Sequence, residues 1–141
     1  MITLLLAVHI GAAILFIGPA TLATSLFARY AASATHDVAQ AMHSISRRYG
    51  TASAVVGIAG FALAAQLKLL GQGWLLLAIV LFVAALIILG GIVIPAQSRA
   101  LDAIETGAEV PEQLRTALRA ASGLYAVTWV VILVLMVAKP F

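Results

Sequence analysis

The sequence contains no cysteine and very little charge. Without cysteine, the chain of 141 residues can form no disulfide, iron–sulfur cluster, thiolate metal site or cysteine nucleophile. Charged residues make up 9% of the chain, whereas a soluble domain carries about 25%. Hydrophobic residues make up 64%. A chain with so few polar side chains cannot cover its surface for water, so we expect its surroundings to be largely lipid.

The sequence signatures of common enzymes are also missing. No Asp or Glu lies within the apolar runs, which argues against paired-carboxylate catalysis and carboxylate proton relays inside a membrane. The chain contains no phosphate-binding glycine loop, no GxSxG nucleophile elbow and no HExxH zinc motif. These absences indicate a non-enzymatic role more than an enzymatic one, without deciding the question.

What the sequence does contain is four continuous apolar runs. A helical run of about 20 residues spans the hydrocarbon core of a membrane, and the alternating pattern of a membrane β-barrel is not seen. We predict an all-α membrane protein, a four-transmembrane-helix bundle that forms a single domain over residues 1–141. The first run is expected to be a retained helix, because the apolar core of a signal peptide is only about 7–15 residues long. The helices are expected at about residues 2–28, 51–70, 75–106 and 112–138.

Lys and Arg are distributed unequally between the two sides of the predicted bundle. The polar segments 29–50 and 97–122 are expected to be connections on one side. In the first of them Val38, Met42 and Ile45 share a helix face, which predicts an amphipathic helix lying at the lipid surface. Cytoplasmic connections carry an excess of Lys and Arg, so both long connections are predicted to be cytoplasmic and both termini outside. The net charge of +3 then reflects membrane orientation, and we expect no nucleic-acid partner. The long connections hold Arg29, Arg47, Arg48, Arg99, Arg115 and Arg119, and the opposite side holds Lys68 and Lys139.

The two halves of the chain share a faint repeat. Tyr49 follows Pro19 by 30 residues, and Tyr125 follows Pro95 by the same number. Each half would consist of a helix, a polar connection and a second helix. The halves would then be parallel repeats related by an axis along the membrane normal. The alternative is that two prolines and two tyrosines match by chance.

His9 is the one ionisable residue deep within an apolar run. It lies about seven residues, or roughly 10 Å, inside the outer boundary of the membrane. An ionisable side chain in a membrane helix suggests a functional site, and a neutral imidazole can bind haem iron or relay protons. The alternative is a histidine that is hydrogen-bonded to a nearby backbone carbonyl, or one that reaches the interface.

Small and basic residues are expected to serve helix packing and lipid binding. Glycine in a membrane helix lets a neighbouring helix approach closely, and basic residues at the membrane surface bind lipid phosphates. His36 and His43 fall in a connection on the opposite side from His9, so we expect them to face solvent or lipid. The glycines expected to pack are Gly11, Gly18, Gly57 and Gly60. The arginines expected to bind anionic lipid are Arg29, Arg47, Arg48, Arg115 and Arg119.

Two stretches of the chain resemble known membrane protein families. From His9 to Gly18 the sequence follows the pattern His-x-x-Ala-Ala-x-x-Phe-x-Gly. This pattern resembles the opening helix of the copper-resistance protein D type, of the oxygen-independent membrane protoporphyrinogen oxidase type, and of small integral membrane families of unknown function. The segment from Ile94 to Arg99 is most similar to the last of these. The resemblance implies a small four-helix protein of the bacterial inner membrane.

The resemblance implies haem more than copper. In the protoporphyrinogen oxidase type a first-helix histidine and a third-helix lysine are essential, and haem is bound. His9 matches that histidine, but the third helix here has no lysine. Copper-handling relatives would show more methionine or histidine near the outer face, where this chain has only Met1 and Met136. The implied cofactor is haem b with His9 as candidate axial ligand, and no other metal is expected.

Two functional hypotheses follow, and a third is less favoured. The first is a membrane protein that binds haem b, or a related redox ligand, through His9 for electron transfer, haem handling or redox sensing. One protomer offers one strong axial ligand, so either the iron is five-coordinate or two protomers share a haem in a homodimer packed on the side of Gly11 and Gly18. The second is a non-catalytic accessory or assembly subunit of a larger membrane complex, in which His9 only packs. A transporter or channel is less favoured, because no helix carries a polar stripe.

Overall fold

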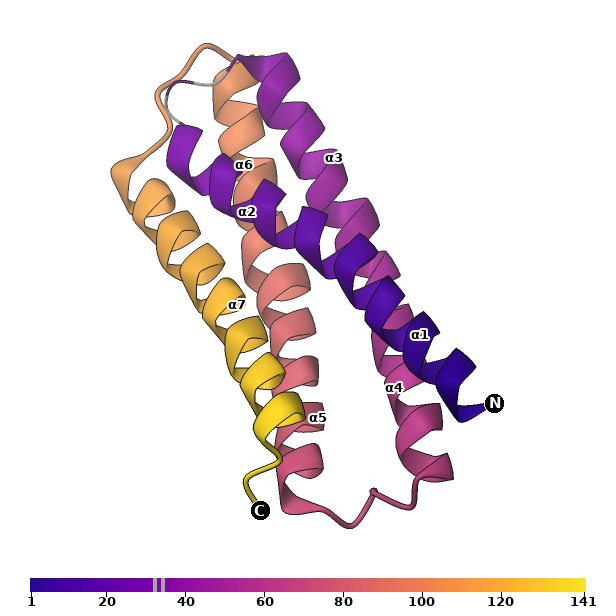
Figure 1. Ribbon diagram of the computed structural model, residues 1–141. Helices are drawn as coiled ribbons and strands as arrows, with labels where there is room; N and C mark the ends of the chain where they lie inside the picture. The colour runs from indigo at the N-terminus through magenta and orange to yellow at the C-terminus, as the bar shows by residue number, and fades with distance from the viewer. Residues whose placement is uncertain (32, 34) are drawn as a thin grey trace.

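Within the residues that the structure describes, the chain folds as four membrane-length helical stretches, which confirms the predicted all-α bundle (Figure 1). The computed structural model describes residues 1–31, 33 and 35–141. The stretches are Ile2–Tyr30, His36–Gln66, Gly73–Glu105 and Glu112–Ala138. In chain order the elements are α1 (Ile2–Ala12), the π-helical turn η1 (Ala13–Ile17), α2 (Gly18–Tyr30), α3 (His36–Ala52), α4 (Ala54–Gln66), α5 (Gly73–Ile88), the π-helical turn η2 (Leu89–Val93), α6 (Ile94–Glu105) and α7 (Glu112–Ala138).

Each proline within a membrane stretch follows a π-helical turn. Pro19 and Pro95 have no backbone N–H, and a proline ring clashes with the carbonyl four residues earlier in an α-helix. A π-helical turn accommodates one extra residue and so separates the ring from that carbonyl. η1 directly precedes the turn of Pro19, and η2 directly precedes that of Pro95. The bends expected at the prolines therefore take the form of widened turns, and the helices continue through them.

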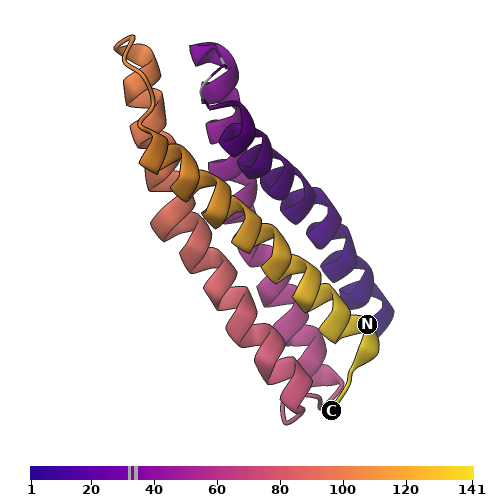
Figure 2. The ribbon, with the colours of Figure 1, turned by 90° about the vertical axis from the view of Figure 1, so that its left-hand side faces the viewer.

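The π-helical turns extend the repeat beyond its prolines and tyrosines. η1 begins at Ala13 and η2 at Leu89, a difference of 76 positions, which is also the difference between Pro19 and Pro95. The contacts between halves match as well, because α2 packs on α7 just as α6 packs on α3 (Figures 1 and 2). A chance match of two prolines and two tyrosines does not explain why a π-helical turn occurs at the equivalent position of each half.

The second stretch begins earlier than predicted. The sequence suggested a surface-lying helix within residues 29–50 and a separate membrane helix at 51–70. In the structure α3 runs on into α4 with a single interruption at Ser53, whose hydroxyl donates to the carbonyl of Gly50. The correction has a physical cause: α3 buries small residues such as Ala39, which let it pack closely on α2 and α6 instead of lying on lipid.

Gly107 follows the end of the third stretch, which the sequence predicts at about residue 106. Gly107 has a positive φ of 72°, which a glycine adopts without steric cost. The next N–H, that of Ala108, donates to the carbonyl of Ala103 at 2.9 Å and closes the helix end. Lys68 has a positive φ of 56° at the corresponding place after α4. α6 ends at Glu105 and α7 begins at Glu112, close to the predicted helix ends at about residues 106 and 112.

The packing places both termini at one end of the bundle. α1 packs along α4 and α2 along α3, while α5 packs along α7. The two halves meet where α2 contacts α7 and where α3 contacts α6, toward the end at which α2 and α6 finish (Figure 1). An even number of spans brings the termini to the same end, and the ribbon shows them there.

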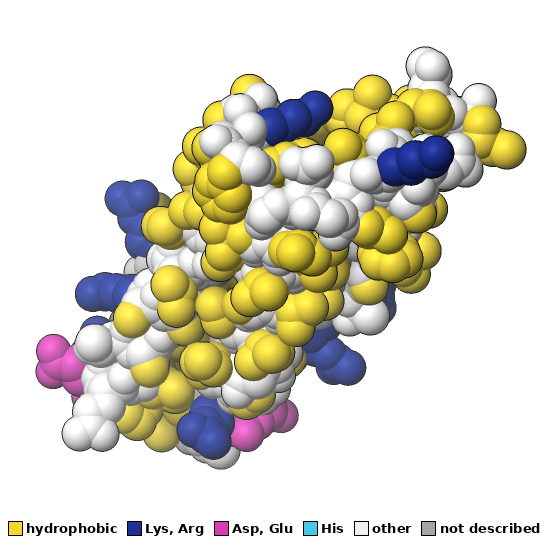
Figure 3. All heavy atoms as spheres, turned by 90° about the horizontal axis from the view of Figure 1, so that it is seen from below, with side chains coloured by type: hydrophobic (Ala, Val, Ile, Leu, Met, Phe, Trp, Pro, Cys, Tyr) yellow, Lys and Arg dark blue, Asp and Glu magenta, His cyan; other side chains and the backbone are white. Residues whose placement is uncertain are grey.

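Many of the buried residues are alanines, and many large apolar residues face outward. Figure 3, seen from the end that carries the termini, shows hydrophobic side chains over most of the surface. Exposed side chains of this kind suit lipid, while small residues inside let the helices pack closely. The core where the halves meet consists of Phe27, Ala28, Ala31, Ala39, Ala96, Ala100, Leu101, Val110 and Leu118.

Gly57 and Gly11 provide a matched test of this packing. A Cβ atom at Gly57 would lie 2.6 Å from Cε1 of Phe82, whereas one at Gly11 would meet nothing within 4 Å. We expect Gly57→Leu to lower the free energy of unfolding by about 1–3 kcal/mol, as overpacking does. Gly11→Leu should leave it unchanged or raise it, because leucine favours a helix more than glycine. Thermal unfolding in detergent measures both, and equal melting temperatures would contradict the contact with Phe82.

Candidate functional site

His9 lies on α1 and faces α4. Its Nδ1 is 2.9 Å from the carbonyl oxygen of Val56. A carbonyl only accepts hydrogen bonds, so Nδ1 carries the proton and donates it. In the neutral ring the lone pair is then on Nε2, and histidines that bind metals have their other nitrogen held in this way. The candidate ligand is half-buried, and of its two ring nitrogens Nδ1 makes a hydrogen bond within the described residues while Nε2 makes none.

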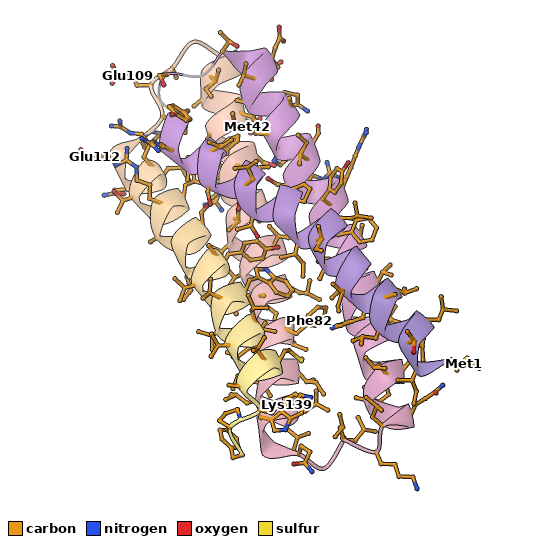
Figure 4. The ribbon with its side chains drawn as sticks, viewed as in Figure 1. Met1, Met42, Phe82, Glu109, Glu112 and Lys139 are labelled. Atoms are coloured by element: carbon orange, nitrogen blue, oxygen red, sulfur yellow. The ribbon has the colours of Figure 1, made fainter. Side chains whose placement is uncertain are left out.

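Two glycines of α4 make room for aromatic rings. A Cβ atom at Gly60 would lie 2.7 Å from Cε1 of His9, which is closer than real side chains approach. A Cβ atom at Gly57, one turn earlier on α4, would be just as close to the ring of Phe82. That ring reaches from α5 toward α4 (Figure 4). Phe82 in turn meets Trp129 of α7 edge-on, with ring centroids 5.7 Å apart. The two glycines thus accommodate side chains and not a neighbouring backbone.

The other two glycines singled out from the sequence point away from the bundle. A Cβ atom at Gly11 or Gly18 would meet nothing within 4 Å. Gly11 is two residues from His9, which is about 200° around a helix. The face with Gly11 is therefore nearly opposite the face with His9, and no helix of the described chain packs closely on it.

A site built from several metal ligands is not formed. Within residues 1–31, 33 and 35–141, no three side chains of His, Cys, Asp or Glu are grouped so as to hold a metal ion. His36 is exposed, and its Nδ1 lies 3.9 Å from a carboxylate oxygen of Asp37.

His43 is buried, and the prediction that it faces solvent or lipid is wrong. The side chain is 6% exposed, and its Nδ1 donates to Oε1 of Gln97 at 3.0 Å. Gln97, which is fully buried, donates from Nε2 to the hydroxyl of Ser46 at 3.2 Å. That hydroxyl donates to the carbonyl of Met42 at 2.9 Å. The network joins α3 to α6 and satisfies polar groups that would otherwise be costly to bury.

Sequence reasoning missed this network because it placed α3 on the lipid surface. A signal was present: Gln97 directly follows an apolar run, and His43 and Ser46 are three residues apart, on one helix face. An amide in α6 and two polar side chains on one face of α3 can satisfy one another only if the helices pack together. No local feature of either segment indicates that the two helices pack together.

The five arginines expected to bind lipid do not form one cluster. Arg29 of α2 and Arg119 of α7 line the same cavity, of about 230 Å³. Arg47 lines a second cavity, of about 200 Å³, between α3 and η2. Arg48 is exposed, and Arg115 is half-buried with its Nε buried and without a hydrogen-bond partner. The structure thus brings together one pair, which comes from opposite halves of the chain.

The sequence matches one family over nearly its whole length. Residues 3–140 match the family described as "Predicted integral membrane protein (DUF2269)". The chain belongs to this family. No curated protein and no solved structure shows significant similarity to it. Membership of DUF2269 confirms an integral membrane protein of the kind that the sequence resembled. The likeness to the copper-resistance and protoporphyrinogen oxidase types stays a prediction.

This DUF2269 member has two histidine sites of different character. His9 bonds to the backbone, and one ring nitrogen stays available. His43 bonds to a side chain that is itself held by Ser46. The two sites use different helices, α1 with α4 and α3 with α6. We therefore treat His9 as the candidate ligand and His43 as part of the contact between the halves.

Replacing Gln97 tests the network of this DUF2269 chain. Gln97→Leu leaves the Nδ1–H of His43 buried without an acceptor, which costs about 1–3 kcal/mol of unfolding free energy. Gln40→Leu is the control, because Gln40 is exposed on the same helix as His43 and should change stability by less than about 0.5 kcal/mol. Melting temperatures in detergent give the comparison. If both variants had the melting temperature of the wild type, the network would not contribute to stability.

Proposed function

We propose that this protein binds haem b in the bacterial inner membrane, with His9 as the axial ligand, and that it serves haem handling or electron transfer. The observation that carries the proposal is the 2.9 Å hydrogen bond from Nδ1 of His9 to the carbonyl of Val56. Histidines that bind metals almost always donate their second ring nitrogen to a carbonyl or carboxylate, which orients the ring and raises its basicity. The resemblance of the segment from His9 to Gly18 supports haem as the cofactor.

The surroundings of His9 suit an apolar macrocycle. On α1 the residues near it include Leu6, Val8 and Ile10, which are exposed on the outside of the bundle. No Asp or Glu lies in the first stretch, Ile2–Tyr30. A porphyrin is stabilised against such side chains by the same burial that holds the helices in lipid.

The position of His9 favours one haem per protomer over a haem shared by two. A homodimer packed on the face of Gly11 and Gly18 would keep the two His9 rings apart, because that face is nearly opposite His9. With one protein ligand, one axial position of the iron is left open. Such a haem exchanges with partners more readily than one held on both sides, so the arrangement supports haem handling more than simple electron transfer.

Haem binding is tested by absorption spectra of the purified protein in detergent, oxidised and reduced, with and without added hemin. The wild type should show a Soret band that shifts on reduction. His9→Ala should weaken haem affinity by about tenfold or more, because an axial ligand contributes at least as much as its hydrogen-bond partners do. His36→Ala, at an exposed histidine, is the matched control and should bind as the wild type does.

Added imidazole separates a ligand role from a structural one. If His9 ligates the iron, imidazole should restore the spectrum of His9→Ala, because a free imidazole can occupy the vacated position. An unchanged spectrum in His9→Ala would exclude His9 as the ligand. A wild type that stays colourless with hemin would overturn the proposal, and it would favour an accessory or assembly subunit of a larger membrane complex.

A further inference from the structure

Outside the His9 site, two arginines from different halves of the chain converge on one cavity. Arg29 of α2 and Arg119 of α7 line a space of about 230 Å³ together with Ser25 and Ser122. The hydroxyl of Ser122 also donates to the carbonyl of Thr24 at 3.2 Å, which ties α7 to α2 at the cavity. Two arginines and two serines therefore line the same space, and the guanidinium of Arg29 also lies 5.5 Å from the centroid of the Tyr30 ring.

No carboxylate neutralises these arginines. In the part of the chain that the structure describes, the one pair of opposite charges within 4.0 Å is His36 with Asp37. Like charges that line a common cavity repel each other, and the repulsion is stronger beside lipid than in water. Arg29 and Arg119 are thus arranged as an anion site would be, and the anion must come from outside the chain.

Polar atoms without partners flank the same cavity. Arg115 is one turn before Arg119 on α7, and its Nε is buried without a hydrogen-bond partner. Thr21 is one turn before Ser25 on α2, and its hydroxyl is buried without a partner as well. Buried polar groups nearly always have a partner in native proteins. Of the four such atoms among the described residues, these two lie one turn from residues that line the cavity.

The equivalent place in the other half of the chain is closed. There His43 and Ser46 of α3 bond to Gln97 of α6, and His43 stands at the position that Arg119 has in the second half. The two halves therefore have the same arrangement of helices but different side chains at the crossing. One crossing has direct hydrogen bonds, and the other has a cavity lined by arginines. The residues that are 76 positions apart are His43 and Arg119, Ser46 and Ser122, and Thr21 and Gln97.

The cavity continues into an apolar surface along both helices. Leu22 lies two turns before Arg29 on the same face of α2 and is 61% exposed. Val130 lies about three turns after Arg119 on the same face of α7 and is 59% exposed. Because α2 and α7 run in opposite directions, both apolar residues lie on the side of the cavity toward the middle of the membrane. A ligand that fits has an anionic head and an apolar tail.

We propose that this cavity binds one anionic phospholipid, with its phosphate between Arg29 and Arg119 and its acyl chains along Leu22 and Val130. Guanidinium groups match phosphate with paired, charge-assisted hydrogen bonds. Basic pockets between membrane helices on the cytoplasmic side are known to bind anionic headgroups. Because only this half of the repeat carries the arginine pair, the stoichiometry is one lipid at this site per chain.

The test is native mass spectrometry of the full chain in detergent, titrated with dioleoyl phosphatidylglycerol or dioleoyl phosphatidylcholine. The wild type should bind one phosphatidylglycerol with an affinity about tenfold higher than for phosphatidylcholine, as expected for charged contacts of this kind. Arg29→Gln and Arg119→Gln should each remove most of that preference. Arg119→Lys should remove part of it, because lysine keeps the charge and lacks the fork. Arg99→Gln, an exposed arginine near the same end, should change affinity less than about twofold.

Three outcomes would overturn the proposal. One is equal affinity for the two lipids in the wild type. Another is an effect of Arg99→Gln as large as that of Arg119→Gln, which would indicate a general effect of surface charge. A third is displacement of phosphatidylglycerol by millimolar inorganic phosphate, which would make a free anion the ligand and leave the apolar surface without a role. Melting temperatures of all variants confirm that any loss of binding is not a loss of fold.

Discussion

A peptide group in lipid has no water to bond with, so every backbone N–H and C=O must be satisfied within the chain. This constraint makes four long helices the natural arrangement for so apolar a sequence. It also explains the two places where the helices depart from regularity. Pro19 and Pro95 each remove a donor and crowd a carbonyl, and a π-helical turn before each one lets the helix continue. The repeat is most visible at these turns because the backbone has few other ways to accommodate a proline.

Polar side chains inside the bundle follow the same constraint with different results. His9 satisfies one ring nitrogen on the backbone of α4 and keeps the other available. His43 is bonded to Gln97, and that amide is bonded to Ser46, so the network is closed. Arg29 and Arg119 have no carboxylate partner within the described chain. A closed network holds helices together, whereas polar groups without a partner in the chain can take one from outside it.

The two halves show how one frame serves different purposes. In both, a proline-containing helix crosses the second helix of the other half, α2 with α7 and α6 with α3. The small residues at these crossings let the helices approach closely and leave space for only a few polar side chains. Which side chains occupy the crossing then decides whether it is an internal contact or a place for a ligand.

The sequence by itself determined the number of membrane helices, the position of their prolines and the end of the third helix at Gly107. These features depend on local properties: hydropathy over about 20 residues, the missing N–H of proline and the positive φ that glycine allows. It also singled out His9, because an ionisable side chain stands out in an apolar run.

Only the tertiary structure decided where the faces of the helices point. The sequence alone predicts that α3 lies on the lipid surface. In the structure its polar face packs on α6, because His43 and Gln97, which are 54 residues apart in the sequence, are hydrogen-bonded to each other. The role of Gly60 follows from a ring on another helix, and the pairing of Arg29 with Arg119 follows from the crossing of α2 and α7. Contacts of this kind depend on how helices pack, and lipid, which surrounds apolar faces almost equally well on any side, gives no local signal for that choice.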